Sequence, residues 1–117
     1  MNLTLRVFPE AEADLREQHH WYLDEAGEAA AEGFITAFRL RSAELLRNPR
    51  MGRLRRFRPI ELSGSRSVIL GHSFEQFVVF YRVTDATVDI VDIVDIVDIV
   101  KVVHGARDQS KLLGYEA

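Results

Sequence analysis

The chain has 117 residues, of which 47% are hydrophobic and 28% are charged, and its formal net charge is −3. This length and balance fit one folded domain and exclude a wholly disordered chain. The lack of cysteine excludes disulfides and cysteine-based metal sites, and no apolar run approaches the roughly 18 residues of a membrane helix. We expect a cytoplasmic protein without signal peptide or membrane association.

The N-terminal half is expected to form a strand and two helices. Residues 3–7 alternate between apolar and polar, which is typical of a strand with one buried face. Pro9 ends this strand and suits the start of a helix, which Gly27 then ends. A second helix is expected over residues 28–47, because Asn48-Pro49 stops it.

The C-terminal half is expected to be a sheet. Its candidate strands cover residues 54–62, 66–70 and 75–83, and a final strand contains a repeat; a short helix is expected at 106–114. The order β-α-α-β-β-β predicts an α+β fold, with a helix hairpin packed on one face of a twisted, mainly antiparallel sheet. Residues 1–117 are interpreted as a single domain.

The repeat consists of four copies of Val-Asp-Ile from Val88, ending at Val100. Deleting three copies would leave 15 acidic residues against 15 basic ones, so the negative net charge comes from the repeat.

Few residues suggest chemistry. There is no phosphate-binding glycine loop, HExxH or GxSxG motif. His19 and His20 are adjacent on a helix and point in different directions, so they cannot form a metal-binding pair; one is expected to be half-buried and the other exposed. No metal or cofactor is expected.

A second group of residues lies at the end of the sheet. His104 and Arg107 follow the final strand and, with Tyr81 and Arg82 on the neighbouring strand, suit acid–base or phosphate chemistry. The alternative is structural, with His104 covering the sheet edge and Arg107 paired with an acid.

Positive charge is concentrated between Arg39 and Arg66, where nine arginines face only two acids. Such a patch attracts phosphate backbones or an acidic protein surface. A solvated surface explains it equally well.

Six motifs in order resemble the ParE branch of the ParE/RelE toxin superfamily of type II toxin–antitoxin systems. They are Pro9–Leu15, Trp21-Tyr22, Leu45–Pro49, Leu62–Arg66, Val79–Val83 and Val103–Asp108. The resemblance covers roughly residues 2–113, interrupted by the repeat.

This resemblance implies one of two activities on the same fold. ParE-like members inhibit DNA gyrase and are not enzymes, whereas RelE-like members cleave messenger RNA on the ribosome. The helix hairpin and the His-Gly-Ala-Arg-Asp ending favour gyrase inhibition, without direct binding to nucleic acid. A RelE-like ribonuclease would use Tyr81, Arg82, His104 and Arg107, and an inactive relative that only binds antitoxin is a further alternative.

In each case the resemblance implies a cognate antitoxin as partner. The surface expected to contact it comprises Trp21, Tyr22, Arg55, Arg56 and Arg58. Trp21 as a core residue is the alternative.

The repeat is too long for a plain strand. Thr87–Val103 would extend roughly 55 Å at about 3.3 Å per residue, beyond the roughly 35 Å diameter of a domain this size. The triplet period also places Asp on both faces. Three alternatives remain: a bulged strand projecting from the sheet, a looped-out segment, and a long hinge that exchanges the C-terminal strand between two chains. We favour exchange in a homodimer, with hinge residues Val88, Asp89, Asp92, Asp95, Asp98 and Val100.

Overall fold

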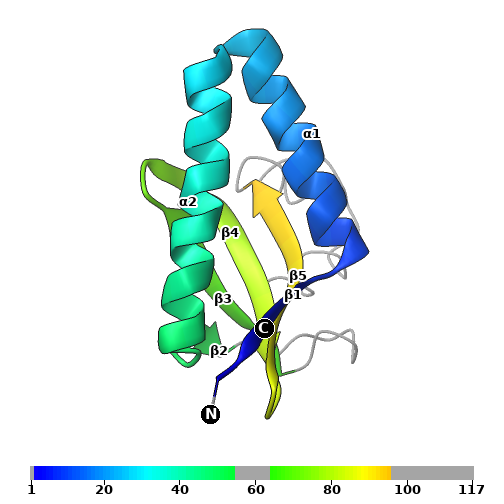
Figure 1. Ribbon diagram of the computed structural model, residues 1–117, viewed down its shortest axis with the longest axis vertical. Helices are drawn as coiled ribbons and strands as arrows, with labels where there is room; N and C mark the ends of the chain where they lie inside the picture. Colours follow the sequence, from blue (N-terminus) through cyan, green and yellow to red (C-terminus); the bar gives the residue numbers. More distant parts are fainter. Residues whose placement is uncertain (1, 55–63, 96–117) are drawn as a thin grey trace, which may run out of the picture.

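The computed structural model describes residues 2–54 and 64–95. Its elements are β1 (Thr4–Val7), α1 (Pro9–Glu25), α2 (Glu28–Arg47), β2 (Arg53–Leu54), β3 (Arg66–Gly71), β4 (Phe74–Val83) and β5 (Thr87–Asp95). Figure 1 shows the two helices as a hairpin over one face of the sheet. The expected α+β fold is confirmed.

The sheet has five strands in the order β1-β5-β4-β3-β2. β1 pairs with β5 in parallel, and the other three pairings are antiparallel, so the sheet is mixed and mainly antiparallel. The expected order β-α-α-β-β-β has one strand fewer than the sheet, in which four strands follow the helices. Residue 54, where the first of them was expected to begin, is the last residue of β2. The rest of the strand expected at 54–62, and the helix expected at 106–114, lie outside the described residues.

The helices begin and end where local chemistry dictates. Pro9 occupies the first turn of α1, where no backbone donor is needed. Gly27 joins the helices with φ of 94°, in the left-handed region that glycine adopts without strain. Neither helix is long and apolar enough to cross a membrane.

The core lies between the hairpin and the sheet. Aromatic rings form its centre: Phe34 of α2 stands 5.1 Å from Phe77 and 5.6 Å from Phe74 of β4, centroid to centroid. Tyr22 of α1 packs against Phe34 at 5.5 Å. The two contacts of Phe34 with β4 are edge-on, and such contacts stabilise a core beyond the area they bury.

A bulge fits the triplet repeat into this core. Tyr81 pairs with Ile90 but Phe80 pairs with Asp92, so Val91 has no partner on β4. Strict alternation from Val88 and Ile90 would place Asp92 in the core, and the bulge presents Ile93 instead. All three apolar side chains are at most 5% exposed.

The described half of the repeat is therefore a bulged strand in the chain's own sheet. The bulge agrees with part of one expected outcome, a bulged strand projecting from the sheet, and the projection itself concerns residues outside the described ones. Strand exchange concerns residues beyond Asp95, including Asp98 and Val100, which lie outside the described residues. It stays a prediction.

Candidate functional site

Tyr81 is held in the core by two hydrogen bonds. Its hydroxyl donates to the Pro49 carbonyl and accepts the Gly52 N–H, both at 2.8 Å. The side chain is fully buried, and this burial raises the pKa of the Tyr81 phenol. A Cβ on Gly52 would collide with the Tyr81 ring. The tyrosine thus fastens the turn after α2 to the sheet.

Arg82 points to the opposite face of the sheet, because neighbouring side chains on a strand alternate. Its Nε donates to Ser65 Oγ at 3.3 Å. Arg66 donates to the Gly52 carbonyl at 2.9 Å. His104 and Arg107 lie outside the described residues. Tyr81 and Arg82 therefore do not converge on one point.

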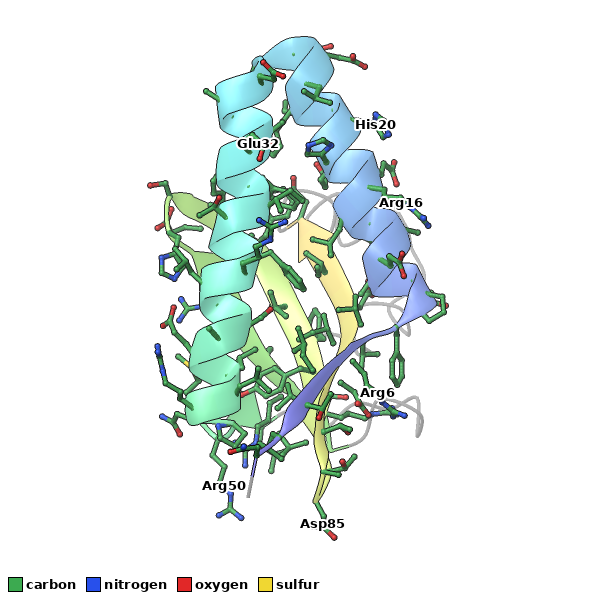
Figure 2. All side chains as sticks on the ribbon, in the orientation of Figure 1. Arg6, Arg16, His20, Glu32, Arg50 and Asp85 are labelled. Carbon is green, nitrogen blue, oxygen red and sulfur yellow. The ribbon has the colours of Figure 1, made fainter. Side chains whose placement is uncertain are left out.

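An ion pair joins the first strand to the repeat. Arg6 donates to both carboxylate oxygens of Asp89 at 2.8 Å, and Arg6 lies on β1 beside β5 (Figure 2). The Asp89 side chain is nearly buried, and the Arg6 hydrogen bonds lower the pKa of this carboxyl. Asp89, expected in a hinge, is an anchor within the sheet.

A second carboxyl of the repeat meets α1. Asp14 and Asp92 share a side-chain hydrogen bond, and the Ile93 N–H donates to Asp92 Oδ1 at 2.9 Å. The Ile93 N–H also acts on Asp14, in the direction that lowers the pKa of this carboxyl. Partial burial first, and then the contact with Asp92, raise the pKa of Asp14 to about 7. With this pKa, the Asp14 carboxyl is partly protonated near neutral pH.

Of the residues expected to contact a partner, Trp21 is exposed and Tyr22 is buried. Trp21 is 54% exposed, so it is not a core residue. Tyr22 is buried and its hydroxyl accepts a hydrogen bond from Gln76 Nε2 at 2.9 Å. The expectation of an exposed Tyr22 was wrong, because this residue faces the aromatic core. Arg55, Arg56 and Arg58 lie outside the described residues.

Part of the arginine-rich segment has structural partners. Arg41 donates to the Leu70 carbonyl and to Glu44, both at 3.1 Å. Glu44 also lies 2.6 Å from His72 Nε2, and that hydrogen bond lowers the pKa of the Glu44 carboxyl. These contacts tie α2 to the turn between β3 and β4. Arg39, Arg47, Arg50 and Arg53 are exposed.

A groove of about 340 Å³ runs between the helices. Its lining carries both charges, with Arg16 and His20 on α1 and Glu32 on α2 (Figure 2). His19 is half-buried and His20 exposed, as expected. Within residues 2–54 and 64–95, no three histidine or acidic side chains are placed to hold a metal ion.

The comparisons with known proteins decide the family. Residues 5–109 match the family described as the ParE toxin of type II toxin–antitoxin system, parDE. The chain belongs to the ParE toxin family. No curated protein matches it.

A solved structure gives the same fold for this ParE-family chain. It comes from the chromosomal ParDE toxin–antitoxin system of P. aeruginosa, with a TM-score of 0.63 and 22% sequence identity. The match covers 80% of this chain and 95% of that one.

Proposed function

We propose that this ParE-family toxin inhibits DNA gyrase, is not an enzyme, and is neutralised in the cytoplasm by a cognate antitoxin. Family membership supports the toxin role. The observation that favours gyrase inhibition over RNA cleavage is the position of Tyr81, whose hydroxyl is buried and engaged with Pro49 and Gly52.

RNA cleavage through a 2′-hydroxyl needs a base, an acid and cations gathered around one phosphate. The Tyr81 side chain faces the helices, and the Arg82 side chain extends from the opposite face of the same sheet. A substrate phosphate that reached Arg82 would be separated from the Tyr81 hydroxyl by the sheet itself. This geometry disfavours the RelE-like reading of the two residues.

The test places two assays side by side. The purified protein is expected to inhibit supercoiling by DNA gyrase and to leave messenger RNA intact in a ribosome-dependent cleavage assay. Addition of the antitoxin encoded in the neighbouring reading frame should restore supercoiling. Cleavage of messenger RNA that is lost in Arg82→Gln, without effect on gyrase, would overturn the proposal. Inactivity in both assays with antitoxin binding intact would identify an inert relative.

The antitoxin is proposed to contact the exposed ring of Trp21. Trp21→Ala is expected to weaken binding of the antitoxin by at least about tenfold, since exposed tryptophans are frequent interface hot spots. Leu40→Ala is the matched control, because Leu40 is 47% exposed on the other helix. Equal losses in both variants, or none in Trp21→Ala, would remove Trp21 from the interface.

A homodimer through exchange of the C-terminal strand is the remaining proposal from the repeat. The placement of Thr87–Asp95 in the chain's own sheet limits such exchange to residues further along. Size-exclusion chromatography with light scattering tests it, and a strict monomer at micromolar concentration would exclude it.

A further inference from the structure

The contact between Asp14 and Asp92 brings together two acidic side chains, one on α1 and one on β5. Asp14 is half-buried on α1, and the charged groups that act on it are Asp92 of β5 and Glu17 of its own helix. Both are acids, so neither compensates a negative charge on Asp14. A cation in the place of Asp92 would turn this repulsion into an ion pair.

The sequence has such a cation, Lys101, nine residues after Asp92, which is three periods of the repeat. Positions 88–95 of β5 read Val-Asp-Ile-Val-Asp-Ile-Val-Asp, and residues 97–104 read Val-Asp-Ile-Val-Lys-Val-Val-His. A shift of the strand by nine residues therefore changes the residue type at three of the eight positions, those of Asp92, Ile93 and Asp95. At the first of these, Lys101 replaces Asp92.

The shifted strand keeps the other contacts of β5. Its core positions, now held by Val88, Ile90 and Ile93, would receive Val97, Ile99 and Val102. Asp98 would take the place of Asp89 opposite Arg6, and Val100 that of the bulged Val91. Every buried apolar position thus stays apolar, and the Arg6 ion pair is retained.

We propose that β5 has two registers nine residues apart, and that in the second register Lys101 replaces Asp92 against Asp14. Shifts of three or six residues fill the core equally well but leave an aspartate, Asp95 or Asp98, against Asp14. Only the nine-residue shift supplies a lysine.

The first register has its own advantage in the turn before β5. The Thr84 hydroxyl accepts the Thr87 N–H at 2.9 Å and lies 2.7 Å from the Thr87 hydroxyl. The shift would lose these bonds and add nine residues to a short connection, which disfavours it roughly tenfold by loop entropy. The ion pair with Lys101 acts in the opposite direction.

Protonation of Asp14 should select between the registers. When Asp14 is protonated it donates to Asp92 and the first register is favoured. When it is charged, the carboxylates repel each other and Lys101 becomes the better partner. Raising the pH through 7 should therefore increase the population of the shifted strand, and with it bring His104 to the end of the sheet.

Pairs of introduced cysteines can report which register β5 adopts, because the chain has no cysteine of its own. Val78 pairs with Val94 in the first register, and Val103 would take that place in the second. We expect intramolecular disulfides in both Val78→Cys/Val94→Cys and Val78→Cys/Val103→Cys. At each pH, the yield of the Val103 disulfide is divided by the yield of the Val94 disulfide. This ratio should rise several-fold from pH 6 to pH 8.

Val78→Cys/Val102→Cys is the matched control. Val102 would point to the other face of the shifted strand, so its disulfide should form at least about fivefold more slowly than that of Val103. Equal rates of disulfide formation for cysteines at positions 102 and 103 would mean that these cysteines meet the one at position 78 at random. That result would overturn the proposal. A disulfide between two chains would also overturn it, in favour of strand exchange.

Lys101→Gln tests the ion pair itself. It should reduce the disulfide at Val103 several-fold at pH 8 and leave the one at Val94 at least as strong. Asp14→Asn should have the same effect, because its amide can donate to Asp92 at every pH. An unchanged disulfide at Val103 in both variants would exclude Lys101 as the partner of Asp14.

Discussion

At the scale of single residues, buried hydrogen bonds separate structural groups from reactive ones. Tyr81 has the residue type and strand position of a catalytic tyrosine, yet both its neighbours in the hydrogen-bond network are backbone groups of the turn after α2. A buried hydroxyl of this kind stabilises the fold because its loss would leave a carbonyl and an N–H without partners.

Tyr81→Phe is expected to lower the free energy of unfolding by about 1–3 kcal/mol, measured by urea denaturation. Tyr22→Phe is the matched control, since its hydroxyl has one side-chain partner, Gln76, and should cost less. Gyrase inhibition per folded molecule should be the same in both variants. A Tyr81→Phe protein of unchanged stability but without activity would restore a direct functional role to this hydroxyl.

The Asp14–Asp92 contact predicts the pH dependence of stability. With the pKa of Asp14 raised to about 7 in the folded chain and about 3.9 when unfolded, the folded state binds more protons between these values. Stability contributed by protonated Asp14 is therefore complete below about pH 4 and is lost as the pH rises towards 7.

Asp14→Asn should remove this dependence, because the amide resembles the protonated acid and can bond both Asp92 and the Ile93 N–H. At pH 8 we expect a higher free energy of unfolding than in the parent, by less than about 1 kcal/mol given solvent screening, and at pH 4 little difference. Asp89→Asn is the control of opposite sign. The lowered pKa of Asp89 contributes stability above its unfolded pKa, so this variant should be the weaker at pH 8.

At the scale of elements, the ends of the helices could be predicted from the sequence because local start and stop residues determine them. Pro9, Gly27 and Pro49 set the helices within two residues of their observed ends, because each acts on its own backbone. The parallel pairing of β1 with β5 has no local signal. Arg6 and Asp89 are 83 residues apart, and the bulge at Val91 depends on which residues β4 presents. These features arise only when the strands meet.

Two glycines of the helix hairpin should respond oppositely to the same change. Gly27→Ala places a Cβ at φ of 94° and should destabilise the protein by about 1 kcal/mol. Gly33 lies within α2, where an added Cβ would stand 3.6 Å from Phe74, an ordinary contact. Gly33→Ala should therefore stabilise by up to about 1 kcal/mol. Thermal unfolding of both variants measures this, and equal signs would contradict the assigned turn geometry.

At the scale of the whole molecule, the repeat is compatible with the ParE fold because one bulge turns a period of three into a continuous apolar face. Aspartates fall on both faces of β5, as the triplet period predicts, so a plain strand would bury some of them. Asp89 is neutralised by Arg6 on one side, and Asp92 is displaced towards α1 by the bulge. What the insertion leaves uncompensated is the carboxyl pair with Asp14.

Deleting residues 91–99 should remove that defect. The shortened strand reads Val-Asp-Ile-Val-Lys from Val88, which places Lys101 opposite Asp14 with the Arg6–Asp89 pair unchanged. The pKa of Asp14 should then fall below its usual value, and its contribution to stability should be lost as the pH falls rather than as it rises. Melting curves of the parent and the deletion from pH 4 to 8 should accordingly differ in slope, and Asp14→Asn in the deletion should abolish the difference. Parallel slopes would show that the acids of the repeat act only through net charge.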